Sequence, residues 1–118
     1  MNTSTTMTSA ALFLMLGLLA PQASSAASFD CNKSDLKADE KTICDNRNLN
    51  DLDVKMVTTF ELMSALLPMG NRGELQDQQS AWLKTRQACN ADATCIGNAY
   101  EARLKQLMSA YTSIQRPQ

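Results

Sequence analysis

The chain has 118 residues, 11 basic and 12 acidic side chains, a formal net charge of −1 and no histidine. A nearly neutral chain lacks the basic surface that binds nucleic acid or anionic membranes. The absence of histidine removes the commonest general base and the commonest metal ligand. We therefore expect no nucleic-acid partner, no metal and no cofactor.

Residues 1–27 have the layout of a secretory signal peptide. The apolar run Ala10 to Ala20 (AALFLMLGLLA) precedes the small, polar stretch Pro21 to Ala27 (PQASSAA). This run is shorter than the roughly 20 apolar residues that a transmembrane helix needs. We expect a domain of residues 28–118, periplasmic or secreted, with no membrane span after cleavage.

Small residues mark two sites where the signal peptide can be cleaved. Ser24 and Ala26 permit cleavage just before Ala27, and Ser25 with Ala27 permits cleavage just before Ser28. The basic residue that usually precedes the apolar run is absent from residues 1–9.

The first predicted helix is short and begins near Ser34. Ser34 is a suitable N-cap and Asp35 would lie in the first turn. The helix would run through Leu36, Glu40, Ile43 and Cys44, with a thin apolar strip.

The second predicted helix carries the longest regular apolar stripe. Asn48 is a suitable N-cap, and Pro68 with Gly70 would end the helix. The stripe recurs at intervals of three and four residues, as one face of a helix does: Leu49, Leu52, Met56, Phe60, Met63 and Leu67. Met69 to Gly73 would then form a short turn with Arg72 exposed between two glycines.

The third predicted helix, Glu74 to Cys89, combines apolar and polar residues on one face. Its strip consists of Leu75, Gln79, Trp82, Arg86 and Cys89. Buried polar groups need partners, because an unpaired one costs roughly 1 to 3 kcal/mol. We therefore predict a buried structural network formed by Glu40, Asp53, Gln79, Arg86 and Arg103, in which Arg86 pairs with Asp53 or Glu40 and Gln79 bridges.

The last predicted helix follows a turn at Asn90 to Thr94, and Pro117 closes the chain. Its apolar stripe is again spaced by three and four residues: Ile96, Tyr100, Leu104, Leu107, Tyr111 and Ile114. No window alternates apolar and polar residues as a strand does. We predict an all-α fold, a small antiparallel bundle of one short and three longer helices.

Four cysteines in a small exported chain predict two disulfides. Three pairings are possible, and we favour the two local ones. Cys31–Cys44 would close a fourteen-residue loop, worth about 3 kcal/mol on the chain-entropy account. Cys89–Cys95 would close a seven-residue loop, worth about 2.4 kcal/mol.

A set of residues spread over the mature region carries a resemblance to a known family. These residues are Ser28-Phe29-Asp30-Cys31, Glu40-Lys41-Thr42-Ile43-Cys44, Leu49, Leu52-Asp53, Gln79-x-x-Trp82-Leu83-x-x-Arg86-x-x-Cys89, Cys95, Tyr100 and Arg103. In them the mature region resembles the bacterial LprI-type lysozyme inhibitor family. Gln87 stands where the family usually has Asp or Asn, and the lipoprotein cysteine of the namesake is absent.

The resemblance implies a protein that binds and blocks a lysozyme or another peptidoglycan hydrolase. We expect no enzyme activity of its own, because two carboxylates without a histidine or a metal cluster need a substrate cleft that a small bundle rarely has. Two alternatives stay open: a chaperone-like periplasmic stress or interaction protein, and an immunity protein against a cell-wall toxin. Loops are the parts of a bundle most free to serve a partner. We therefore expect Arg72 and Asp51 to be the partner-binding residues.

Overall fold

The computed structural model describes residues 27–115, so the predicted signal peptide up to Ala26 and the end of the chain at Pro117 lie outside the described residues. Residues 27–115 contain four helices and no strand: α1 (Ala38–Asp45), α2 (Arg47–Leu66), α3 (Met69–Ala88) and α4 (Ala93–Ile114). The all-α prediction, with one short and three longer helices, is confirmed.

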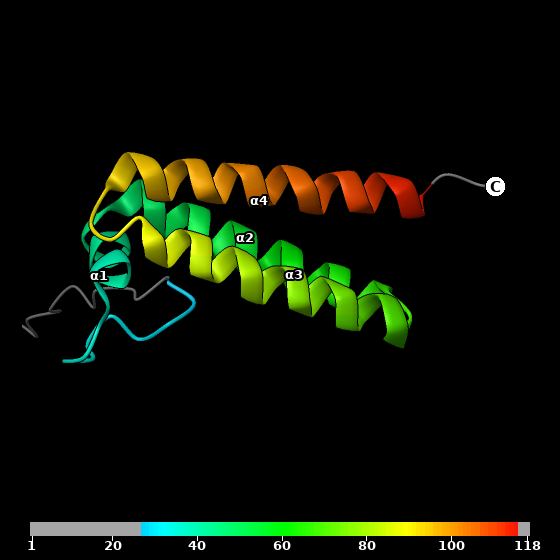
Figure 1. The fold of residues 1–118 in the computed structure, drawn as a ribbon, viewed down its shortest axis with the longest axis horizontal. Helices are drawn as coiled ribbons and strands as arrows, with labels where there is room; N and C mark the ends of the chain where they lie inside the picture. The colour runs from blue at the N-terminus through cyan, green and yellow to red at the C-terminus, as the bar shows by residue number, and fades with distance from the viewer. Residues whose placement is uncertain (1–26, 116–118) are drawn as a thin grey trace, which may run out of the picture.

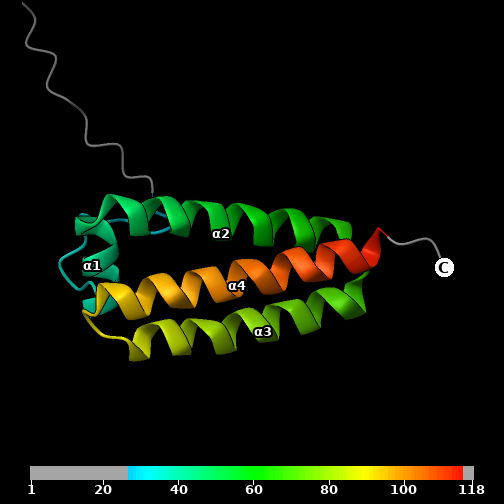
Figure 2. The ribbon, with the colours of Figure 1, turned by 90° about the horizontal axis from the view of Figure 1, so that it is seen from above.

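The three long helices run side by side, and α1 crosses one end of them (Figure 1). α2 and α4 run in the same direction, and α3 runs the opposite way. Seen from above, α4 lies between α2 and α3 (Figure 2), and it packs against both of them. Helix α4 therefore joins α2 to α3.

The apolar stripes of the helices form one continuous core. The predicted positions Leu49, Met56 and Met63 of α2 are buried, as are Ile96, Tyr100, Leu104 and Leu107 of α4. Helix α3 contributes Leu75 and Trp82, its C-cap residue Cys89 is also part of the core, and the short helix contributes Ile43.

The starts of the first two helices differ from the prediction. Helix α1 begins at Ala38, not near Ser34, because the backbone N–H of Lys37 donates to the Glu40 carboxylate over 2.9 Å. Helix α2 is capped by Asn46, not Asn48, and the Asn46 side chain accepts from the N–H of Leu49 at 3.2 Å. Asn46 alone thus separates the two helices.

The predicted turn at Met69 to Gly73 is wrong, because these residues form the first turn of α3. Pro68 is the residue that precedes α3, with φ −59°. Its carbonyl accepts the N–H of Arg72 at 2.9 Å. A proline ends one helix because it has no N–H, yet its fixed φ suits the start of the next.

Candidate functional site

The most unusual feature of the core is an arginine buried between two carboxylates. Arg86 of α3 is 3% exposed, and its Nε–H donates to Oδ2 of Asp39 at 2.9 Å. The guanidinium nitrogen Nη1 lies 3.7 Å from Oδ1 of Asp53 on α2. Asp39 and Asp53 are 1% and 0% exposed. A buried charge with a bonded counterion is far less costly than an isolated one.

Tyr100 of α4 links the arginine to the second carboxylate. Its hydroxyl accepts a hydrogen bond from Nη1 of Arg86 at 3.0 Å and donates one to Oδ1 of Asp53 at 2.7 Å. One hydroxyl therefore satisfies groups from two other helices. A buried tyrosine needs such a partner for its O–H.

Aromatic rings surround the guanidinium of Arg86. Its Cζ lies 5.7 Å, 5.8 Å and 5.9 Å from the ring centroids of Phe29, Trp82 and Tyr100, distances at which cation–π attraction operates. Trp82 is fixed in turn, because its indole N–H donates to the carbonyl of Ala99 at 2.8 Å. The network thus joins the N-terminal segment to all four helices.

The partner of Arg86 on α1 is Asp39 and not the predicted Glu40. Asp39 was not predicted from the sequence. Glu40 caps its own helix through the N–H of Lys37. Asp39 lies four residues before the fully buried Ile43, so both lie on the inward face of α1. This spacing is the signal that could have identified Asp39.

Gln79 and Arg103 form a second set of contacts further along the bundle. Nε of Arg103 donates to the Gln79 carbonyl oxygen at 2.8 Å, and Nη1 donates to Gln106 at 3.2 Å. Gln79 also contacts the sulfur of Met56 at 3.1 Å. Gln79 therefore bridges α3 to α2 and α4 but does not touch Arg86, contrary to the predicted role.

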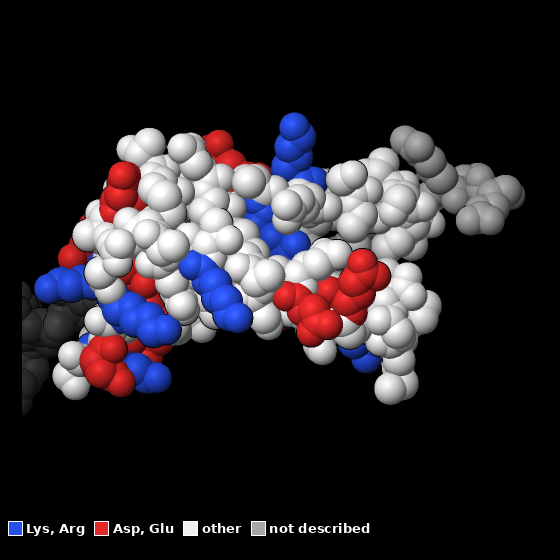
Figure 3. All heavy atoms as spheres, in the orientation of Figure 1, with Lys and Arg blue, Asp and Glu red and all other residues white. Residues whose placement is uncertain are grey.

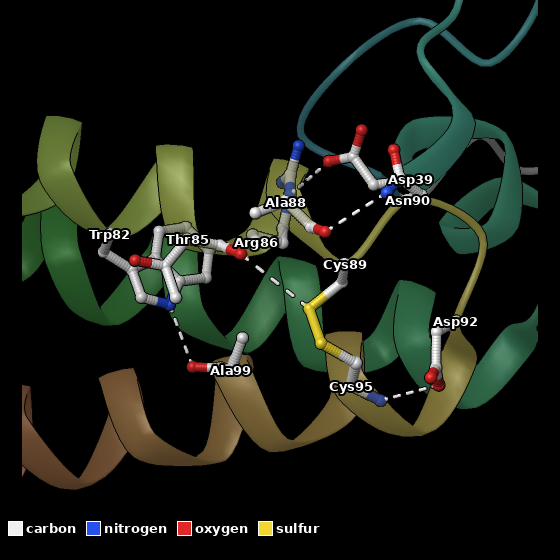
Figure 4. Close-up of a disulfide and its surroundings, with 10 residues drawn as sticks. All are labelled: Asp39, Trp82, Thr85, Arg86, Ala88, Cys89, Asn90, Asp92, Cys95 and Ala99. Carbon is white, nitrogen blue, oxygen red and sulfur yellow. Dashed lines mark hydrogen bonds and ion pairs between the residues drawn. A yellow bond between two sulfur atoms is a disulfide. The ribbon is translucent and has the colours of Figure 1, made fainter.

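Two disulfides hold the end of the bundle at which Arg86 lies. Cys31–Cys44 ties the N-terminal segment to α1, and Cys89–Cys95 ties the end of α3 to the start of α4. The predicted local pairing is confirmed. Figure 4 shows the second disulfide beside Arg86 and Asp39, with Asp92 capping α4 through the N–H of Cys95.

The two predicted partner-binding residues have different surroundings. Asp51 is exposed in the first turns of α2. Arg72 is half-buried in α3, and one of its terminal nitrogens donates to the carbonyl of Leu67 at 3.1 Å. Arg72 therefore fastens the α2–α3 connection and does not project from a loop.

No group of three or more His, Cys, Asp or Glu side chains within residues 27–115 is placed to hold a metal ion. An open groove of about 540 Å³ lies between α3 and α4 near the network, with Trp82, Thr85 and Arg103 among its lining residues. No helix in the same range is long and apolar enough to cross a membrane.

Burial raises the pKa of Tyr100 well above its ordinary value of 10, and the charge of Asp53 adds to this effect. Between the unfolded pKa and the higher folded pKa, the folded protein keeps a proton that the unfolded chain loses. This contribution to stability is complete below pH 10 and is lost as the pH rises further.

We therefore expect the free energy of unfolding to fall by about 1.4 kcal/mol per pH unit above pH 10 because of Tyr100. Chemical denaturation between pH 9 and 11 measures this slope. The Tyr100→Phe variant, which has no proton to lose there, serves as the control. An equal slope in both proteins would contradict the assignment.

Comparison with known proteins finds similarity to two mycobacterial relatives. Lipoprotein LprI of Mycobacterium bovis and Lipoprotein LprI of Mycobacterium tuberculosis are each 31% identical to this chain over 93 residues. The match covers 76% of this chain but only 45% of each relative, so the chain spans about half the length of these proteins. No family model and no solved structure matches the chain. The similarity is distant and suggests an LprI-like protein.

Proposed function

We propose that this protein is an exported inhibitor that binds a peptidoglycan-cleaving enzyme of the lysozyme type and blocks it. The observation that carries the proposal is the similarity to the LprI proteins, which extends over most of the chain. This similarity agrees with the LprI-type resemblance noted in the sequence. Inhibition by binding requires a stable surface and no chemistry of its own.

The buried network supports a binding role because its polar groups are bonded to one another. Asp39 and Asp53 are directed at Arg86 and Tyr100, within the core. A glycosidase would need its pair of carboxyl groups to face a substrate cleft. We infer that the network serves to hold the four helices together so that the outer surface keeps one shape.

The end of the bundle opposite α1 offers an apolar surface, which we call the distal surface. Met69 is 84% exposed, Leu62 62% and Leu66 59%. Part of this surface is a hollow of about 400 Å³ between α2 and α4. Exposed apolar residues that gather at one end of a protein mark sites of protein contact. The distal surface consists of Leu62, Leu66, Met69, Met108, Tyr111 and Ile114.

Charged residues of both signs are mixed on the face of α3 and α4, and many lie toward the α1 end (Figure 3). That arrangement, together with the net charge of −1, gives little long-range attraction for a basic lysozyme. We therefore propose that apolar contact at the distal surface, rather than charge, supplies the affinity. Asp51 is exposed on α2 and stays a candidate for a secondary contact.

The proposal is tested by adding the purified mature protein to a peptidoglycan suspension with a basic animal-type lysozyme or a bacterial peptidoglycan hydrolase. We expect a saturable loss of turnover that is complete at a fixed molar ratio of protein to enzyme. Undiminished turnover of both enzymes at a large molar excess of the protein would reject the inhibitor reading.

Leu66→Glu is expected to weaken inhibition about tenfold or more, because it places a charge in the centre of an apolar contact. Leu66 is 59% exposed, so the fold should tolerate the change. The inhibition constant is the measurement, and circular dichroism checks the fold.

Asn48→Glu is the matched control for Leu66→Glu. Asn48 is exposed on the same helix but lies near the other end of that helix. Its replacement by glutamate therefore adds the same charge far from the distal surface. Equal inhibition constants for the two folded variants would remove the distal surface from the mechanism.

A second candidate function, the holding of unfolded client proteins, is favoured by the same distal surface. Such a surface can take up apolar segments of many sequences without a fixed stoichiometry. Suppression of client aggregation at low pH, without stoichiometric inhibition of any lysozyme, would support this function over the first.

A further inference from the structure

The buried network contains one more negative charge than positive. Asp39 and Asp53 are both fully buried, and Arg86 is the only cation within 4.0 Å of either one in residues 27–115. Asp39 has the closer contact, at 2.9 Å against 3.7 Å for Asp53. Arg103, which is also buried, bonds to Gln79, Gln106 and the carbonyl of Leu75 instead. A buried carboxylate without its own counterion is costly.

A further positive charge would balance the network, and the second carboxylate oxygen of Asp53 shows where it would lie. One oxygen, Oδ1, accepts the Tyr100 hydroxyl, and the other, Oδ2, accepts the backbone N–H of Ser28 at 2.6 Å. Ser28 lies near the start of the described chain, and the adjacent Phe29 packs over Arg86. A backbone nitrogen 25 residues away in sequence thus sits on the least neutralised carboxylate of the core.

Ser28 is also the first residue after one of the two candidate cleavage sites of the signal peptide. Ser25 and Ala27 supply the small residues that a leader peptidase requires before the cut. The charge deficit and the cleavage pattern are independent observations, one from the core contacts and one from the sequence. The cleavage pattern permits two sites, and the core contacts select the one that frees the nitrogen of Ser28.

We propose that the chain is cleaved between Ala27 and Ser28 and that the new α-ammonium group of Ser28 forms an ion pair with Asp53. A leader peptidase hydrolyses the peptide bond with one water molecule. The hydroxyl of the water goes to the carbonyl carbon of Ala27, and its other hydrogen goes to the Ser28 nitrogen. The new carboxyl group loses its proton and leaves as a carboxylate, and the amine of Ser28 takes up a proton to become the ammonium group. Removal of the leader therefore supplies the missing positive charge.

The cleavage changes what Ser28 offers to Asp53. A peptide N–H is neutral and has one hydrogen, whereas an α-ammonium group carries a full charge and three hydrogens. The α-amino group of a model peptide has a pKa near 8, so it is charged at neutral pH. The peptide N–H already donates to an ionised acceptor, and the α-ammonium group adds a full opposite charge to that contact. The processed domain is therefore the form in which the core is electrically balanced.

The first test is the N-terminus of the exported protein. The full chain is expressed in a host that exports it, and the mass and N-terminal sequence of the processed protein are measured. We expect the processed chain to begin at Ser28. A chain that begins at any other residue would overturn the proposal.

The second test compares three forms of the domain at pH 7. The first begins at Ser28 with a free amine, the second is the same chain acetylated at that amine, and the third begins at Ala26 with a free amine. We expect the folding equilibrium constant of the first form to exceed those of the other two about tenfold or more. Equal stability of the free and acetylated forms would overturn the ion pair.

The Asp53→Asn variant is the matched background for this comparison. It removes the charge but leaves an oxygen that can accept a hydrogen bond. We expect the stability gap between the free and acetylated forms to disappear in this variant. If the free and acetylated forms of the Asp53→Asn variant differ in stability as much as those of the wild type, the ammonium group pairs with another residue and the proposed pair with Asp53 is wrong. The N-terminal sequence of the wild-type protein decides the cleavage site even if the variant does not fold.

Discussion

Replacing Arg86 with alanine is expected to lower the free energy of unfolding by about 3 to 5 kcal/mol, the loss found when one partner of a buried ion pair is removed. The variant would leave Asp39 and Asp53 buried without their shared cation, and Tyr100 without one of its two hydrogen bonds. The total stability of a small domain is only about 5 to 15 kcal/mol. Urea denaturation followed by circular dichroism is the measurement.

Lys84→Ala is the control for this prediction, because Lys84 is exposed on the same helix. Its effect should stay within about 0.5 kcal/mol. Similar midpoints for the two variants would show that Arg86 contributes no more than a solvated side chain.

Loss of both disulfides is expected to lower the free energy of unfolding by about 5 kcal/mol on the loop-entropy account. The paired replacement of Cys31 and Cys44 by serine should cost about 3 kcal/mol, and that of Cys89 and Cys95 about 2.4 kcal/mol. The first pair also holds the segment that carries Phe29 and the helix that carries Asp39. We therefore expect its removal to have the larger effect.

Denaturation with and without a thiol reductant measures these losses. The variant without any of the four cysteines is the control, because the reductant should not change its stability. Free thiols in the native wild-type protein, detected as a mass shift with maleimide, would contradict the prediction.

The helices could be predicted from the sequence because their stripes are regular. Leu49, Met56 and Met63 recur at helical spacing, and all three are buried in α2. The ends of the helices were harder to predict. Asn46 and Asn48 are equally good caps in isolation, and the choice between them depends on where α1 ends. Pro68 predicts a helix end correctly, but the sequence does not show that a new helix begins one residue later.

The candidate site was predicted only in part, because adjacent residues on a helix point about 100° apart. Asp39 and Glu40 are equally acidic, so the choice between them depends on how α1 is rotated. That rotation is determined by the burial of Ile43 and by the Cys31–Cys44 bond. Tyr100 occupies a position of the apolar stripe of α4. That pattern predicts its burial but does not show that its hydroxyl takes part in the network.

The contacts that complete the network join distant parts of the chain. Asp39 with Arg86, and Asp53 with Tyr100, are each 47 residues apart in sequence. Helices α3 and α4, by contrast, are joined by a connection of four residues that Cys89–Cys95 spans. Closing a long loop costs more chain entropy than closing a short one. We therefore expect the hairpin of α3 and α4, which pack against each other, to form before the contacts of Asp39 and Asp53 that close the longer loops.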